Sequence, residues 1–246
     1  MKKPLAGKVA LVTGGAHRLG AEIVRTLAAE GAAVAIHARR HAKEAETIAR
    51  AIRRRGGRAA VLAADLEDTE EVLGLVPACV DELGGLDVLV NNAGVFERVA
   101  ADVPDVDAFD RAMAVNARAP YVLSIEAGKR MKAARGGTIV NVACVSVWAP
   151  YTGYLAYSAS KAALANLTAG LAKALAPTVR VNAVAPGAIL PPEGATPAEE
   201  RRAIAATRLG RWGSPADVAA AVRYLVVDAP YVTGVVLPVD GGRHLA

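Results

Sequence analysis

Lys8-Val9-Ala10-Leu11-Val12-Thr13 is a short apolar run, and Gly14-Gly15-Ala16-His17-Arg18-Leu19-Gly20 follows it directly. The first run predicts a buried strand, and residues 18–30 predict a helix that ends at Gly31. Glycine allows a sharp turn close to a phosphate, and a helix N-terminus offers free N–H groups. The stretch therefore predicts a nucleotide-phosphate site, whose expected binding residues are Gly14, Arg18, Leu19 and Gly20.

Short apolar runs alternate with amphipathic stretches along the whole chain. Strands are expected at residues 8–13, 33–37, 59–63, 86–91, 138–142, 179–183 and 235–239. Helices are expected at residues 18–30, 41–55, from about 68, about 106–133, 154–176 and 216–226, with Pro77 predicted to kink or restart the third. This order predicts an α/β fold, a single Rossmann-type domain over residues 1–246 with helices on both faces of a doubly wound parallel sheet. Ligands of such sheets bind beyond the carboxyl ends of the strands.

Composition excludes several classes of function. None of the four histidines has a neighbour at a metal-ligand spacing, so no metal site is expected. No apolar run approaches the roughly 18 residues of a membrane span. The net charge is +5, but no aromatic residues interleave the arginines, which argues against nucleic acid as a partner. Two distant cysteines and no signal peptide favour a cytoplasmic protein with a small-molecule substrate.

The second expected strand ends in His37-Ala38-Arg39-Arg40-His41, with no Asp or Glu between Gly31 and Lys43. A cofactor with a free ribose 2′-hydroxyl requires an acidic residue at this place. Two guanidinium groups instead suit a 2′-phosphate, with which they make charge-assisted hydrogen bonds. NADP(H) is therefore the expected cofactor, bound through His37, Arg39 and Arg40. The alternative is that the two arginines are only a solvated helix start.

Tyr157 and Lys161 stand four residues apart in an Ala- and Leu-rich stretch, and so on one face of a helix. A phenol is a poor acid or base at neutral pH, but an adjacent ammonium draws its pKa downward. The pair predicts a group that moves one proton while a cofactor moves a hydride. Because any such helix can carry a Tyr and a Lys at this spacing, the pair alone is weak evidence.

Further motifs extend the pattern over nearly the whole chain, namely Asp65-Leu66, Asn91-Asn92-Ala93-Gly94, Asn116, Pro186-Gly187 and Val239-Asp240-Gly241-Gly242. In this order they resemble the short-chain dehydrogenase/reductase family. The resemblance implies that Asp65 and Leu66 border the adenine, and that Asn92, Ala93 and Gly94 line the cofactor wall. It implies that Asn116 holds a proton-relay water and that Lys161 also binds the nicotinamide ribose. Pro186, Gly187 and Ile189 would touch the nicotinamide end.

Within the family the details resemble the pteridine reductase branch, which includes bacterial dihydrofolate and dihydromonapterin reductases. Arg18 stands where most members have glycine, and the resemblance implies that it reaches both cofactor phosphate and pterin. Phe96 matches an aromatic residue that stacks on a flat heterocycle. The alternative for Phe96 is a loop aromatic that packs on its own core.

One position departs from the family pattern. Thirteen residues before Tyr157 the family usually has serine, and the pteridine branch aspartate, but here the residue is Cys144. A thiol is a weak hydrogen-bond donor. Ser146 would point to the same side in an extended segment and could take the role instead. The loop from Leu190 to Arg208 is expected to be the substrate lid.

The expected activity is NADPH-dependent reduction of a pterin or dihydropterin, with Tyr157 as proton donor. One alternative is reduction of a 3-oxoacyl thioester or another ketone by the same chemistry. Another is a nucleotide-binding sensor without catalysis, which only Cys144 favours. The resemblance also implies a homotetramer, formed through the helices at residues 106–133 and 154–176 and the C-terminal strand region.

Overall fold

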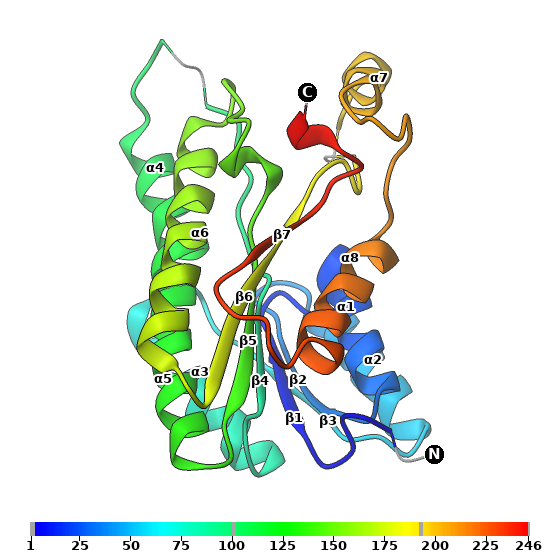
Figure 1. Cartoon of the computed structure of the whole chain (residues 1–246), viewed down its shortest axis with the longest axis vertical. Helices are drawn as coiled ribbons and strands as arrows, with labels where there is room; N and C mark the ends of the chain where they lie inside the picture. The colour runs from blue at the N-terminus through cyan, green and yellow to red at the C-terminus, as the bar shows by residue number, and fades with distance from the viewer. Residues whose placement is uncertain (1–2, 100–101, 192–193, 246) are drawn as a thin grey trace.

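A seven-stranded parallel sheet with the order β3-β2-β1-β4-β5-β6-β7 forms the centre of the molecule (Figure 1). The computed structural model describes residues 3–99, 102–191 and 194–245. The strands are β1 (Val9–Val12), β2 (Ala33–His37), β3 (Ala59–Leu62), β4 (Val88–Asn91), β5 (Gly137–Val142), β6 (Val179–Pro186) and β7 (Val236–Val239). β1 pairs with both β2 and β4, so the strand order reverses there and opens a crevice at the carboxyl ends. The predicted fold class is confirmed.

Helices cover both faces of the sheet (Figure 1). They are α1 (Arg18–Ala29), α2 (Ala42–Arg54), α3 (Thr69–Leu83), α4 (Val106–Met113), α5 (Ala119–Ala133), α6 (Leu155–Leu175), α7 (Pro197–Ala205) and α8 (Pro215–Arg223). One face packs on α1, α2 and α8, and the other on α3, α5 and α6. Consecutive side chains of a strand point to opposite faces of the sheet. Because helices bury both faces, nearly every strand residue is apolar, and the strands appear in the sequence as continuous apolar runs.

Two expected helix boundaries differ from the structure. α3 runs without interruption through Pro77, so the predicted restart there is wrong. The carbonyl of Leu73, to which an amide at position 77 would donate, lies in a residue that is 37% exposed, so solvent can replace that bond. The expected helix 106–133 is two α-helices joined by a π-helical turn at Ala114–Arg118, and Pro120 lies in the first turn of α5.

The segment expected to be a lid contains α7, which begins with a capping box between Thr196 and Glu199 and has no buried residue. Residues 192 and 193 of that segment lie outside the described residues. In the described part of the chain no helix is both long and apolar enough to cross a membrane.

Candidate functional site

A cavity of about 1550 Å³ opens at the carboxyl ends of the strands. Segments that follow β1 to β6, the start of α6, the lid and the C-terminal tail contribute to its wall. The predicted site residues that line it are Gly14, Arg18, Leu19, Gly20, His37, Arg39, Arg40, Asp65, Leu66, Asn92, Ala93, Gly94, Phe96, Cys144, Tyr157, Lys161, Pro186 and Gly187. Asn116, Ser146 and Ile189 do not line it.

The glycine-rich turn presents the start of α1 to this cavity. Gly14 has a φ of 60°, which favours glycine, and a side chain there would approach Ala93. His17 precedes α1 and makes no side-chain cap, so the first-turn N–H groups are left for a ligand. With the positive end of the helix dipole, this arrangement fits a pyrophosphate.

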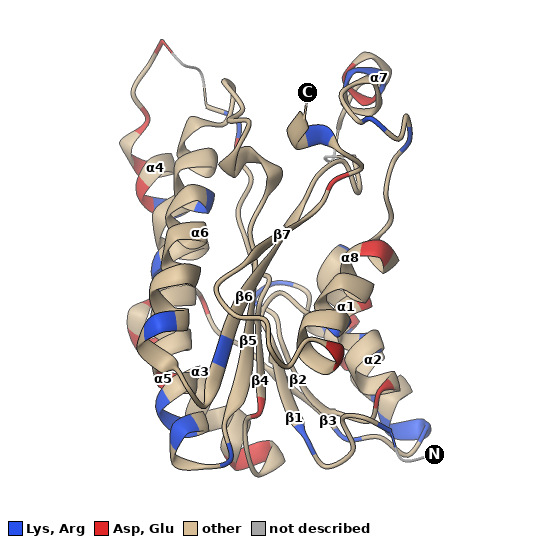
Figure 2. Cartoon of the chain, in the orientation of Figure 1, with Lys and Arg blue, Asp and Glu red and all other residues tan. Residues whose placement is uncertain are grey.

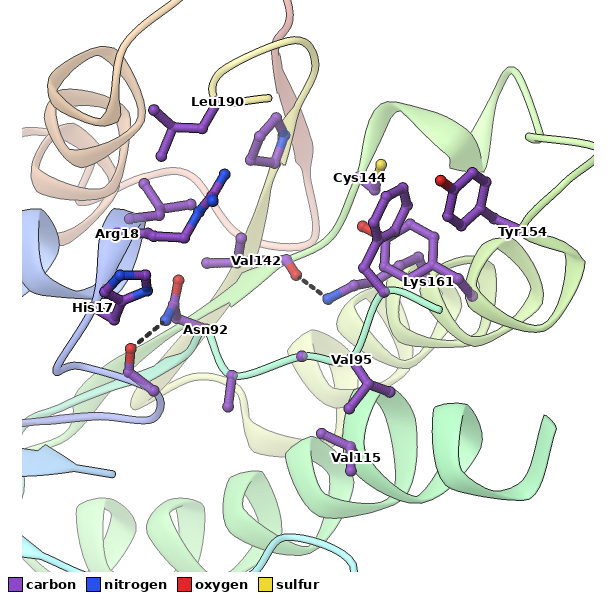
Figure 3. Close-up of a pocket in the computed structure, with 18 of the residues that line it drawn as sticks. His17, Arg18, Asn92, Val95, Val115, Val142, Cys144, Tyr154, Lys161 and Leu190 are labelled. Carbon is purple, nitrogen blue, oxygen red and sulfur yellow. Dashed lines mark hydrogen bonds between the residues drawn. The ribbon is translucent and has the colours of Figure 1, made fainter. Parts of the chain in front are cut away.

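Arg18 has a φ of 48° and is the one non-glycine residue with a positive φ among those described. A long side chain in this region is strained, and such strain persists where the surroundings impose it. The guanidinium donates to the Pro191 carbonyl at 2.7 Å. Arg18 therefore links the glycine-rich turn to the lid segment. Figure 3 shows Arg18 close to Leu190, at the start of that segment.

His37 ties the glycine-rich turn to the end of β3. Its Nδ1 accepts from the Gly14 N–H at 3.1 Å, and its Nε2 then donates to the Ala64 carbonyl at 3.0 Å. Burial lowers the pKa of His37, so the neutral ring that these two bonds require is favoured. His37 lines the cavity from beneath and holds the turn in shape.

Arg39 and Arg40 differ in their surroundings. Arg39 donates to Asp65 at 2.8 Å and to Glu67 at 3.0 Å, and the hydrogen bond with Asp65 is the main reason that its pKa is raised. Within residues 3–99, 102–191 and 194–245, no carboxylate forms an ion pair with Arg40. The sequence directly after β2 has no acidic residue, but the segment that follows the neighbouring strand β3 supplies two carboxylates to Arg39.

The loop after β4 is fixed by amide side chains. Asn92 donates to the Thr13 carbonyl at 2.9 Å and to the Gly14 carbonyl at 3.1 Å. Asn116, in the π-helical turn, accepts from the Val95 N–H and donates to the Val95 carbonyl. A side chain at Gly94 would lie 3.0 Å from Asn116 Oδ1, a tight contact that favours glycine there. The side chain of Asn116 thus positions the cavity wall, and its water-holding role stays a prediction.

Tyr157 and Lys161 face the cavity from α6, but among the described groups no hydrogen bond joins their two side chains. Lys161 Nζ donates to the Val142 carbonyl at 2.7 Å and lies 5.9 Å from the centre of the Tyr157 ring (Figure 3). Burial lowers the pKa of Lys161 to about 8. Burial and the neighbouring Cys144 raise the pKa of Tyr157, so the expected lowering by Lys161 is not produced by the chain's own groups. Tyr157 is therefore a protonated phenol at neutral pH.

Cys144 lies beside the phenols, whereas Ser146 does not. Cys144 Sγ is 4.0 Å from the hydroxyl of Tyr151 and accepts from the Ser146 N–H at 3.4 Å. Residues 145–147 form a 3-10 turn, so the extended geometry that would place both side chains on one side is absent. Ser146 is buried, and no described group hydrogen-bonds to its hydroxyl.

Phe96 lies at the cavity and not in the core, since 42% of its surface is exposed. Tyr154 stacks on one face of its ring at 4.1 Å between centroids, and the Tyr157 ring meets it edge-on at 4.6 Å. This aromatic group forms one wall of the space in front of Tyr157.

Several lining residues were not foreseen from the sequence. Tyr151 and Tyr154 precede Tyr157 by six and three residues, a cluster that the sequence displays. Arg243 follows the last strand, and the rule that ligands bind at carboxyl ends could have indicated it. Ile189 instead packs in the core cluster beneath the sheet end, while its neighbours Ala188 and Leu190 line the cavity.

The model of the short chain dehydrogenase family matches residues 8–202. The chain belongs to this family. Among curated short-chain dehydrogenases, it is 40% identical to 4-formylbenzenesulfonate dehydrogenase of Comamonas testosteroni over 97% of this chain and 98% of that protein. It is 39% identical to cis-4-hydroxycyclohexanecarboxylate dehydrogenase of Sinomonas cyclohexanicum, over 98% of each chain.

A solved short-chain dehydrogenase structure extends the comparison to three dimensions. FolM alternative dihydrofolate reductase 1 from Brucella canis, crystallised with NADP, superimposes with a TM-score of 0.93 at 39% identity. The match covers 100% of this chain and 97% of that one.

Proposed function

We propose that this short-chain dehydrogenase is an NADPH-dependent reductase of a pterin or dihydropterin, with Tyr157 as the proton donor. Arg18 carries the proposal, because a strained arginine joins the phosphate-binding turn to the lid. From that place it can contact both the cofactor phosphates and a heterocycle held beneath the lid. The similarity to a dihydrofolate reductase of Brucella canis supports the same reading.

The cofactor is NADP(H), in agreement with the NADP bound in the Brucella canis structure. The uncapped start of α1 suits the pyrophosphate, and Arg40 provides a cation for the 2′-phosphate. Arg39 lines the same edge of the cavity, where Asp65 and Glu67 hold its guanidinium in place. When bound, NADPH supplies the hydride.

The chain's own groups would orient the substrate and deliver one proton. Because burial keeps Tyr157 protonated at neutral pH, its phenol is in the form that reduction requires. Lys161 holds the end of β5 through Val142 and keeps a polar N–H group at the inner end of the cavity. Phe96 and Tyr154 offer an aromatic wall against which a flat ring can lie.

A second candidate is reduction of a ring compound that carries a carbonyl. Cys144 favours it, since the aspartate typical of the pteridine branch is absent. The relatives from Comamonas and Sinomonas, named for 4-formylbenzenesulfonate and cis-4-hydroxycyclohexanecarboxylate, point the same way.

The test is NADPH oxidation with dihydrobiopterin, dihydrofolate, dihydromonapterin, 4-formylbenzenesulfonate and an acetoacetyl thioester in parallel. The proposal expects the highest kcat/KM with a dihydropterin, at least about tenfold lower activity with NADH, and no turnover by Tyr157→Phe despite normal NADPH binding. Turnover of the aldehyde alone would favour the second candidate. Tight NADPH binding without turnover of any compound would favour a sensor.

A further inference from the structure

Arg243 lies in the C-terminal tail directly after β7, where Figure 2 colours the short last helical turn blue. It lines the cavity, and its guanidinium lies 5.2 Å from the centre of the Tyr151 ring, over the ring face. An aromatic face under a guanidinium fixes its plane while leaving its N–H groups free to bind an anion. None of the described carboxylates forms an ion pair with it.

The tail that carries Arg243 is held rigidly by the residues around it. The buried Asp240 carboxylate accepts from the N–H groups of Gly242 at 2.9 Å and His244 at 2.8 Å. The His244 ring contacts the same carboxylate at 2.7 Å and packs on Trp148 at 5.5 Å between centroids. A side chain on such a fixed turn is already positioned for binding, so little freedom is lost when a ligand arrives.

The position of Arg243 relative to the reacting end is set by Tyr151. The Tyr151 ring lies under the guanidinium, and its hydroxyl is 4.0 Å from Cys144. Cys144 in turn neighbours Tyr157. These contacts put Arg243 on the Tyr151 side of the cavity, where it can reach the far end of a small substrate whose reacting carbon faces Tyr157.

The other arginines of the cavity differ from Arg243 in their partners or in their place. Arg98 forms an ion pair with Glu199 on α7 at 3.5 Å, and Arg18 donates to the Pro191 carbonyl. Arg39 and Arg40 lie at the opposite end, after β2. Arg202 on α7 also lines the cavity, but Arg243 is the guanidinium that lies over the Tyr151 ring, whose hydroxyl is next to Cys144.

We propose that Arg243 selects substrates that carry an anionic group, a carboxylate or a sulfonate, on the side of the ring opposite the reacting carbon. This inference rests on the proposed function for its reaction but not for its binding site. A charge-assisted hydrogen bond of this kind contributes about 1.5–3 kcal/mol, which corresponds to roughly 10- to 150-fold in affinity. Arg243 would then be a specificity-determining residue for the reductase.

The test measures binding apart from turnover, by calorimetric titration of the NADP-loaded protein with benzoate and with neutral benzamide. The expected result is at least about tenfold tighter binding of benzoate, a preference that Arg243→Met abolishes and Arg243→Lys restores in part. Arg201→Met is the matched control, because Arg201 is exposed on α7 and does not line the cavity. In kinetics, Arg243→Met should raise KM for dihydrofolate, which carries carboxylates, about tenfold and leave KM for dihydrobiopterin and both kcat values within twofold.

Each outcome decides one of the two proposals. Absent benzoate binding, equal weakening by the Arg201 and Arg243 variants, or weaker NADPH binding by Arg243→Met would overturn the anion site. A benzoate preference that depends on Arg243, without turnover of any pterin, would keep the anion site and reject pterin reduction. If the unmodified protein turned over both pterins and Arg243→Met changed the two KM values equally, pterin reduction would stand and the anion site would be rejected.

Discussion

At the scale of single residues, Cys144 and Ser146 separate two explanations of how Tyr157 is assisted. Cys144 lines the cavity, and Ser146 is buried with an unpaired hydroxyl. We therefore expect Cys144→Ser to raise kcat for a ketone several-fold, since a stronger donor then faces the substrate. Ser146→Ala should leave kcat within twofold and should not lower Tm, because it removes an unsatisfied buried group. Steady-state kinetics and thermal unfolding check both variants, and a tenfold loss in Ser146→Ala would restore the role first expected for Ser146.

Lys161 predicts a pH dependence of stability. Burial lowers its pKa from 10.5 to about 8. Between these values the unfolded state keeps the proton that the native state has lost, so the free energy of unfolding rises with pH. Below about pH 8 both states are protonated, and burying the charged ammonium then lowers the free energy of unfolding by on the order of 3 kcal/mol.

The comparison that isolates this group is Lys161→Met. The free energy of unfolding of the unmodified protein minus that of Lys161→Met should increase from pH 7 to pH 10 in urea titrations. The raised pKa values of Cys79 and Tyr157 lower the free energy of unfolding at high pH. Both groups are present in both proteins, so their contributions cancel in the difference. Lys173→Met, at an exposed position of the same helix, should show no such trend. A flat difference for Lys161→Met would mean that its ammonium is not desolvated.

At the scale of elements, the approach of α1 to the turn after β1 depends on Gly20. A side chain there would collide with the Gly14 carbonyl oxygen and lie 2.5 Å from Asn92 Nδ2. Gly20→Ala should therefore lower the free energy of unfolding by at least about 2 kcal/mol and weaken NADPH binding more than tenfold.

Gly74 provides the opposite case within another helix. It lies inside α3, and no atom lies within 4 Å of the place that an added methyl group would take. Gly74→Ala should therefore stabilise the protein by about 0.5–1 kcal/mol through helix propensity. Urea unfolding and fluorescence titration with NADPH measure both variants. If the two substitutions behaved alike, the close approach of α1 would not be what constrains Gly20.

The elements themselves were largely predictable, because strands buried on both faces leave unbroken apolar runs. The sequence could not reveal that β6 continues to Pro186, since this extension depends on pairing with the distant strand β7. It could not reveal the π-helical turn around Asn116, which is fixed by contacts with the distant Val95 and Ser160. The pairing of Arg39 with Asp65 likewise depends on the neighbouring strand order and not on local sequence.

At the scale of the whole molecule, α4 and α6 lie side by side on one flank (Figure 1) and present exposed apolar residues. Phe109 is 45% and Val106 65% exposed, and small residues such as Ala162, Ala169 and Gly170 face outward from α6. The homotetramer implied by the family resemblance remains a prediction, and this flank suits it.

The assembly is tested by light scattering. The unmodified chain should give a mass about four times 25.2 kDa. Phe109→Glu should lower that mass, because a charge placed in an apolar interface is costly to bury. Leu73→Glu, which adds the same charge on α3, should leave the mass unchanged. A monomer in the unmodified protein at micromolar concentration would contradict the prediction.

α7 carries its own capping box and buries none of its residues, although Glu199 and Arg202 face the cavity. Its sequence is therefore free of the demands that the core places on the other helices. Replacing residues 194–206 with those of a relative should therefore change the substrate preference to that of the relative. The melting temperature and the cofactor affinity should remain those of this protein. We therefore expect substrate preference to depend on α7, and stability to depend on the sheet and the helices that pack on it.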